Sequence, residues 1–108
     1  MRTSQAWFLS AALGLALGSL AQAAWAGPDE DMAKAGCTAC HTKDKKLVGP
    51  AFKDIAAKYK GQDVSAKLFD KVRKGGSGVW GPIPMSPNGP DKIGDAELHA
   101  VIAAILKL

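Results

Sequence analysis

Apolar residues form one long block near the start of the chain and then recur at helical spacing. Residues 6–20 are almost wholly apolar, whereas the chain after residue 27 mixes short apolar stripes with charged positions. In several later segments the apolar residues fall three and four positions apart, which places them on one face of a helix. No segment shows convincing alternation of the kind expected for a half-buried strand. The pattern predicts an all-α domain behind an N-terminal apolar segment.

Capping and breaking residues set the bounds of four predicted helices. The first has a proline and three acidic residues at its start, where they face the positive end of the helix dipole. The fourth carries the strongest apolar stripe, with Leu98, Val101, Ile102, Ile105 and Leu106. The predicted helices run from Pro28 to about Ala35, from Pro50 to Gly61, from an N-cap at Asp63 to the glycines at 75–78, and from Asp95 to Leu108.

The N-terminal segment has the three parts of a secretory signal peptide. Residues 1–5 carry a positive charge, residues 6–20 are apolar, and Ala21-Gln22-Ala23 is a small-x-small cleavage site. The apolar run is shorter than the roughly twenty residues that span a bilayer. We therefore expect residues 1–23 to be removed, with a second possible cut after Ala26. Residues 24–108 would then be exported as one domain without stable membrane insertion.

Charge and length limit what the exported domain can be. Removal of Arg2 leaves 13 of the 14 basic residues against 10 acidic ones, a net charge of +3. The lysines are dispersed, so nucleic-acid binding is not indicated. A domain this short buries a small core and usually needs an additional staple.

The chemistry of the chain is concentrated in Cys37-Thr38-Ala39-Cys40-His41. Cys-x-x-Cys-His is the attachment signature of c-type haem. Positions three apart share a face of a helical turn, so both thiols can reach the vinyl groups of one porphyrin. His41 then lies beneath the ring, where an imidazole nitrogen can bind the iron. The pentapeptide predicts one covalently attached haem c, which would also be the missing staple.

Three other interpretations of the two cysteines are weaker. A zinc site needs four ligands, and His99 is the one further histidine. A thioredoxin-like pair needs a preceding strand, but residues 31–36 are not strand-like. A disulfide between cysteines three apart closes too small a loop to stabilise a fold much.

A proline-rich segment supplies the expected sixth ligand of the iron. Four prolines between Val79 and Pro90 make regular structure improbable there and predict a pinned, largely extended loop that contains Met85. Pre-ordering suits a weak thioether ligand, and His/Met ligation is typical of cytochromes c. Met32 precedes Cys37 by five residues and is expected in the core, whereas His99 is expected to be structural or exposed.

The motifs together resemble those of the small bacterial class I cytochromes c, of the c-551/c-552 (c8) type. They are Cys37–His41, Val48-Gly49-Pro50-Ala51-Phe52 and the segment Gly78–Asn88, which contains VWGPIPM. The resemblance covers essentially the whole exported chain. It implies four to five short helices wrapped around one haem, ligation by His41 and Met85, and a periplasmic electron shuttle that donates to nitrite reductases or terminal oxidases.

The same resemblance implies further residues around the haem. The Pro50 carbonyl would accept a hydrogen bond from His41, and second-shell bonds of this kind orient a metal ligand. Trp80 would reach a haem propionate and Asn88 would bond near the Met85 sulfur. Lys71 stands where many relatives carry an arginine near a propionate, and lysine lacks the bidentate fork.

An iron bound by both His41 and Met85 has no open position for a substrate. We therefore expect a monomeric, non-enzymatic one-electron carrier that meets redox proteins through its exposed haem edge. The alternatives are a haem enzyme or gas sensor with an open or labile sixth position, and a haem subunit of a larger enzyme. For Lys43, Lys45 and Lys46 two interpretations stay open: they ring the haem edge, or they are ordinary solvated lysines.

Overall fold

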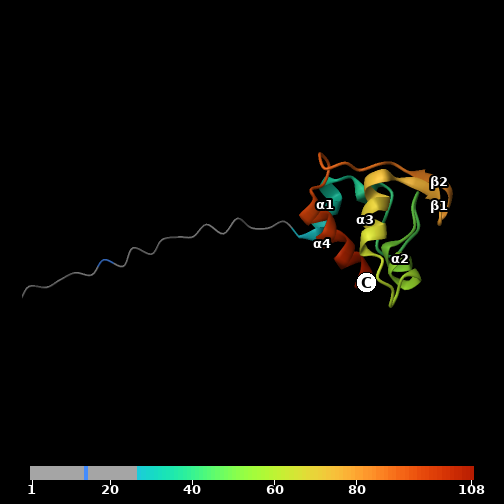
Figure 1. Ribbon diagram of the computed structural model, residues 1–108, viewed down its shortest axis with the longest axis horizontal. Coiled ribbons are helices and arrows are strands. Elements are labelled where there is room, and N and C mark those ends of the chain that lie inside the picture. The colour runs from blue at the N-terminus through green and yellow to red at the C-terminus, as the bar shows by residue number, and fades with distance from the viewer. Residues whose placement is uncertain (1–13, 15–26) are drawn as a thin grey trace, which may run out of the picture.

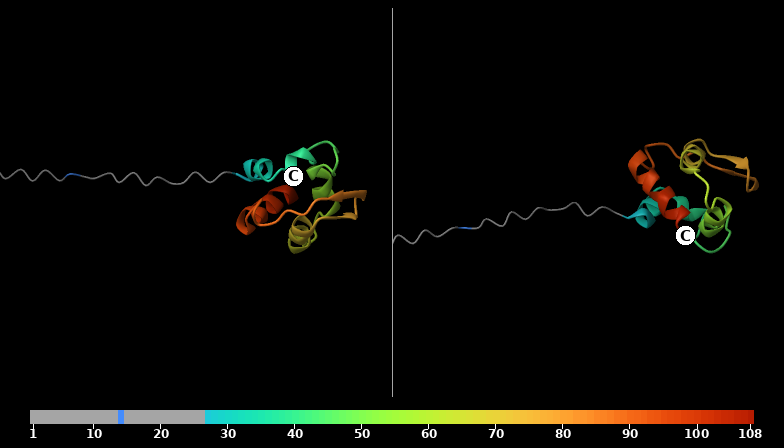
Figure 2. Two further views of the ribbon diagram at one scale, coloured as in Figure 1. Left: turned by 90° about the horizontal axis from the view of Figure 1, so that it is seen from above. Right: turned by 60° about the horizontal axis from the view of Figure 1, so that its bottom comes forward.

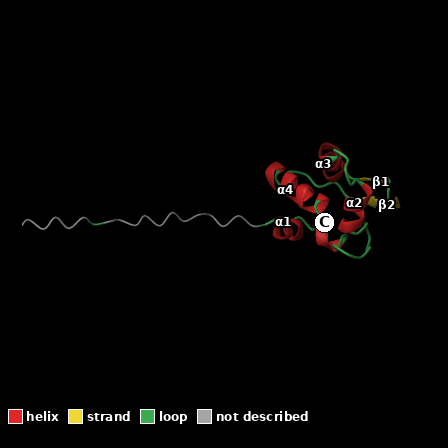
Figure 3. Cartoon of the chain, turned by 90° about the horizontal axis from the view of Figure 1, so that it is seen from below, coloured by secondary structure: helices red, strands yellow, loops and turns green. Residues whose placement is uncertain are grey.

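A computed structural model describes residue 14 and residues 27–108. The predicted signal peptide and both candidate cleavage sites lie outside the described residues, apart from Gly14. Figure 1 shows a cluster of helices with a small hairpin at one end, and Figure 3 shows the same division by secondary structure. The elements are α1 (Pro28–Lys34), a short 3₁₀ helix (Cys37–Ala39), α2 (Phe52–Lys58), α3 (Ser65–Lys74), β1 (Gly76–Gly78), β2 (Gly81–Met85) and α4 (Asp95–Leu106).

Helix α4 is the packing partner of the other three α-helices, α1, α2 and α3. The views in Figure 2 show it crossing close to α1. Its predicted stripe is confirmed, since Leu98, Val101 and Ile102 are buried and Ile105 and Leu106 pack against the same cluster. The helix ends two residues earlier than predicted. No helix in the described part of the chain is long and apolar enough to cross a membrane.

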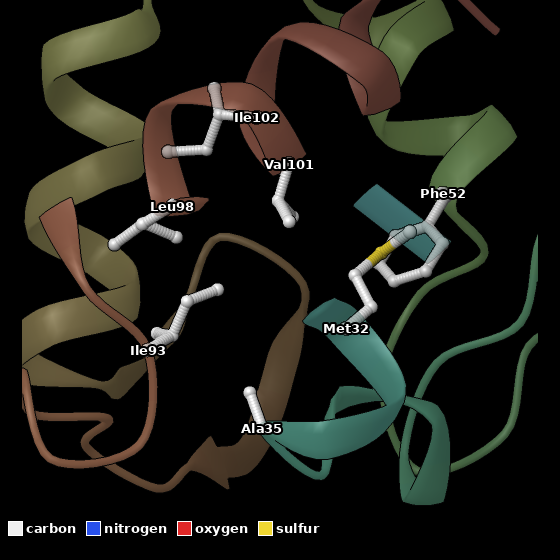
Figure 4. Packing of buried hydrophobic residues seen from close by; sticks show 7 residues of the cluster. All are labelled: Met32, Ala35, Phe52, Ile93, Leu98, Val101 and Ile102. Carbon is white, nitrogen blue, oxygen red and sulfur yellow. The ribbon is translucent and has the colours of Figure 1, made fainter. Parts of the chain in front are cut away.

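The core is small and gathers side chains from three helices and one loop. Figure 4 shows α1 and α4 directing residues into the same space. The seven buried residues of the cluster are Met32, Ala35, Phe52, Ile93, Leu98, Val101 and Ile102. A core of this size fits the expectation that the domain needs a further stabilising element.

The helix before the cysteines ends as predicted. Pro28 stands at the first turn of α1, followed by three acidic residues, and Lys34 lies in the last turn, so charges suit the dipole at both ends. Ala35 caps the helix, and Gly36 adopts a φ of 83°. That left-handed conformation suits glycine, and it turns the chain directly into the 3₁₀ helix at Cys37.

Helix α2 begins two residues later than predicted. Pro50 was expected to open it, but Ala51 is extended (φ −61°, ψ 142°) and acts as the N-cap of a helix that starts at Phe52. The Pro50 carbonyl is hydrogen-bonded to His41, and the Phe52 N–H donates to the Thr42 carbonyl at 2.9 Å. These bonds tie residues 50–52 to the segment that follows the cysteines.

The predicted N-cap of α3 is wrong. The capping residue is Val64, not Asp63, and it makes no side-chain capping bond. Val64 is buried, and its carbonyl accepts the Leu68 N–H at 2.9 Å. Burial of an apolar side chain, rather than capping by a carboxylate, fixes this helix start.

The expectation that residues 79–90 lack regular structure is also wrong in part. Strands β1 and β2 form an antiparallel hairpin in which Gly76 pairs with Met85 and Gly78 with Gly81. Pro82 and Pro84 have no N–H, and both lie between the two paired positions of the strand, 81 and 85. The prolines therefore fall at positions that need not donate to β1, as prolines in edge strands do.

Candidate haem site

One cavity of about 400 Å³ lies between the helices and the hairpin. Its walls include every residue that the sequence assigned to the site: Cys37, Cys40, His41, Pro50, Lys71, Trp80, Met85 and Asn88. Val48, Val79, Trp80 and Ile83 also line it, although these large apolar side chains are 40–58% exposed. Exposed apolar walls of this extent fit a large apolar ligand.

The two cysteines are held on a single tight turn. The His41 and Cys40 N–H groups both donate to the Cys37 carbonyl, at 3.0 and 3.1 Å. Both thiols are free and half-buried on the cavity wall. Burial raises the pKa of the Cys37 thiol above its usual value, while a backbone hydrogen bond opposes the rise and the nearby Cys40 adds to it. Both positions are thus available for bonds to a ligand in the cavity.

The imidazole of His41 is fixed from three sides. Its Nδ1 lies 2.8 Å from the Pro50 carbonyl oxygen, which is the hydrogen bond expected between them. Its ring stacks on Phe52 with centroids 5.1 Å apart. A β-carbon on Gly49 would collide with the ring, 2.9 Å from Nδ1. Because the carbonyl can only accept, Nδ1 carries the proton and Nε2 keeps a lone pair for a metal.

Met85 lines the cavity from the hairpin. Met85 ends β2, is half-buried, and pairs across the hairpin with Gly76. The Asn88 N–H donates to the Val72 carbonyl at 2.9 Å, which joins the segment after Met85 to helix α3. His41 and Met85 therefore lie on the walls of one cavity but belong to segments 44 positions apart.

The other three predicted residues have different local roles. The Asn88 side-chain amide donates to the Ser86 carbonyl at 3.0 Å and to the Val72 carbonyl at 3.5 Å. Trp80 is 40% exposed, with the Lys58 ammonium 5.6 Å from its ring. Lys71 is half-buried, and its Nζ lies 3.2 Å from where a β-carbon on Gly76 would stand.

Arg73 was not identified from the sequence. One of its guanidinium nitrogens donates to the carbonyls of Ile93 (2.8 Å) and Asn88 (3.2 Å), and another pairs with the Asp95 carboxylate. The side chain is 13% exposed and also lies over the Phe69 ring. Arg73 thus ties α3 to both ends of the loop that leads from Met85 to α4. An arginine in a lysine-rich helix gives no signal of such a role.

Two further residues behave as predicted. Met32 is 4% exposed and belongs to the core. His99 is exposed, stacks on Phe69 at 4.5 Å, and does not line the cavity. No three His, Cys, Asp or Glu residues of the described ranges cluster as a metal site.

Most of the described chain matches the sequence pattern of one family. The model of the family Cytochrome c matches residues 30–108. The chain belongs to the cytochrome c family. This cytochrome c is 54% identical over 77 residues to cytochrome c-551 of Pseudomonas aeruginosa, a match that covers 68% of this chain and 74% of the relative. It is 47% identical over 95 residues to cytochrome c-552 of Nitrosomonas europaea, which covers 86% and 90% of the two chains.

A solved structure has the same fold as this cytochrome c. The crystal structure of wild-type cytochrome c552 from Nitrosomonas europaea superposes with a TM-score of 0.68 at 46% identity, covering 74% of this chain and 98% of that one. Family membership implies one covalently bound haem c and a role as a monohaem electron carrier. The cavity fits that group, because it joins apolar walls, two free thiols and an imidazole whose Nε2 can accept a metal.

Proposed function

We propose that this cytochrome c is a soluble periplasmic one-electron carrier with a saturated iron. In this proposal Cys37 and Cys40 attach the haem, His41 and Met85 bind the iron, and Trp80 and Lys71 face its propionates. The observation that carries the proposal is the fixed His41 ring on the wall of the cavity that Met85 also lines. When bound, the haem supplies an iron that cycles between the ferric and ferrous states.

The protein residues keep the structural rearrangement that accompanies this change of charge small. His41 is held by its hydrogen bond, its stacking contact and the packing at Gly49, so it need not move when the iron changes state. Met85 offers a neutral, soft ligand from a proline-stiffened strand. A neutral thioether favours the less charged ferrous state, and Met/His ligation is associated with raised potentials. The residues thus suit electron transfer rather than substrate turnover.

Three measurements test this function. The ferrous protein should take up carbon monoxide slowly, because both axial positions are filled, and should exchange electrons with nitrite reductases or terminal oxidases of its source. Rapid carbon monoxide binding would instead indicate an open or labile sixth position. The haem should also stay with the polypeptide after acid–acetone extraction, since two thioethers would hold it.

Export is tested separately. We propose cleavage of the signal peptide after Ala23, or after Ala26. Mass spectrometry of the periplasmic protein should find a chain that begins at Ala24 or Gly27 and carries one haem. A chain that retains Met1 or Arg2 would show that the apolar segment acts as an anchor.

A further inference from the structure

Three exposed lysines lie around a second hollow, which is lined by residues from the end of α2, from α3 and from the turn of the hairpin. Lys67 and Lys74 stand seven positions apart on α3, which places them on one face of that helix. They line a cavity of about 300 Å³ together with Tyr59 and Trp80. Lys58, at the end of α2, extends over the same two rings. We call Lys58, Lys67 and Lys74 the lysine face.

In the described part of the chain, no ion pair neutralises the charges of the lysine face. The four ion pairs found among residues 27–108 use Lys34, Lys43, Lys53 and Arg73, and none uses a lysine of this face. Asp70 is the one carboxylate on the wall of the hollow. Like charges held close together repel. The approach of an anionic surface relieves this repulsion and is therefore electrostatically favourable.

Aromatic rings hold two of these ammonium groups in place. The Lys58 Nζ lies 5.9 Å from the centre of the Tyr59 ring and 5.6 Å from that of Trp80, and the Lys67 Nζ lies 5.7 Å from that of Tyr59. Cation–π contacts at these distances are attractive. They hold the Lys58 charge between Tyr59 and Trp80 and the Lys67 charge beside Tyr59, so the charge pattern is partly pre-organised before a partner binds.

The hollow adjoins the haem cavity. Leu68, Lys71, Val79 and Trp80 line both cavities. A protein that covers the lysine face would therefore be separated from the haem cavity by a single layer of side chains. Electron transfer slows steeply with distance, so a short separation matters for a carrier.

We propose that the lysine face is the docking surface for an acidic redox protein, with Trp80 at its centre. The proposal rests on the proposed electron-transfer function. The loop lysines Lys43, Lys45 and Lys46 form the alternative docking surface. We favour the lysine face over that loop, because Lys43 is already paired with Asp29 at 3.3 Å. Redox encounters use small interfaces, in which charge complementarity mainly raises the association rate.

The test compares two variants that lose the same charge from different faces. One carries Lys58→Gln, Lys67→Gln and Lys74→Gln, and the control carries Lys43→Gln, Lys45→Gln and Lys46→Gln. Stopped-flow measurement follows oxidation of each ferrous protein by plastocyanin, a small acidic blue copper protein, and by hexacyanoferrate(III), at several ionic strengths. Lys71 is left intact because it lines the haem cavity.

The lysine-face variant should lower the rate constant with plastocyanin about tenfold at low ionic strength and flatten its salt dependence. The control should change it by less than about twofold. An equal or larger loss in the control would overturn the proposal, since net charge or the loop would then govern docking. A loss with hexacyanoferrate(III) alone would also overturn it, because the face would then bind only small anions.

Folding and ligation are checked independently. Both triple variants should retain the wild-type visible spectrum and potential. If the lysine-face variant does not, the single variant Lys67→Glu takes its place and should slow the plastocyanin reaction more than Lys45→Glu. A wild type that binds carbon monoxide rapidly would contradict the proposed function, whatever the lysine variants do.

Discussion

The backbone of Met85 lies against the α-carbon of Gly75, so closely that a side chain at position 75 would have no room. A β-carbon built there would collide with the Met85 carbonyl oxygen and stand 2.9 Å from the Pro87 nitrogen. Gly75 also has a φ of 68° and a ψ of −155°, a conformation open essentially to glycine alone. The end of α3 therefore sets the position of the proposed methionine ligand.

Gly75→Ala should displace the loop and weaken binding of Met85 to the iron. The expected result is loss of much of the near-infrared band that arises from sulfur-to-iron charge transfer in the ferric protein. Gly61→Ala is the control, because Gly61 also has a positive φ, 76°, but nothing lies within 4 Å of a β-carbon there. It should cost about 1–2 kcal/mol of stability and keep the band. Equal loss of the band in both variants would show that backbone strain alone is responsible.

Gly49→Ala should disturb the other side of the iron. The new methyl group would overlap the His41 ring, so the imidazole must shift away from Pro50 or the loop must open. We expect a lower free energy of unfolding and a mixed ferric spin state. Electron paramagnetic resonance detects the spin state. Gly27→Ala meets nothing within 4 Å and should leave the spectrum unchanged. An unaltered low-spin spectrum in Gly49→Ala would mean that the packing does not hold the ring.

Arg73→Gln should destabilise the protein by about 2 kcal/mol, because it removes charge-assisted hydrogen bonds to two loop carbonyls. Asp95→Asn should cost less than about 1 kcal/mol, since the Asp95 carboxylate is 73% exposed. Denaturant unfolding of the haem-loaded variants measures both. A larger cost for Asp95→Asn would show that the ion pair, rather than the carbonyl contacts, anchors the loop.

The sequence predicted most of the helices because helical spacing is a local pattern. Helical spacing located the core face of α4, and the Cys-x-x-Cys-His motif located the turn that carries His41. All eight predicted site residues line the same cavity. Local patterns of this kind survive folding because neighbouring residues in the chain create them.

The features that the sequence did not predict depend on contacts between distant segments of the chain. Prolines normally argue against strands, but Pro82 and Pro84 lie between the two paired positions of β2, Gly81 and Met85, and that pairing needs the partner β1. Val64 caps α3 because the fold buries it, which outweighs the capping propensity of Asp63. The close approach of Gly75 to Met85 likewise appears only once the hairpin returns to the end of α3.

Replacement of Met85 by histidine tests the chemistry of the sixth ligand. Met85→His should keep a six-coordinate, low-spin iron, because imidazole is also an axial ligand. The reduction potential should fall, since imidazole stabilises ferric iron better than a thioether does. Redox titration measures the shift. A potential equal to that of the wild type would indicate that Met85 does not bind the iron.

The most direct test of the account is the near-infrared spectrum of the ferric protein in two methionine variants. Met85→Ala should abolish the sulfur-to-iron band and open the iron to carbon monoxide or cyanide. Met32→Leu is an apolar exchange of similar volume in the core, and it should keep the band and the potential. Loss of the band in Met32→Leu with its survival in Met85→Ala would contradict the proposed ligand and, with it, the site described for this carrier.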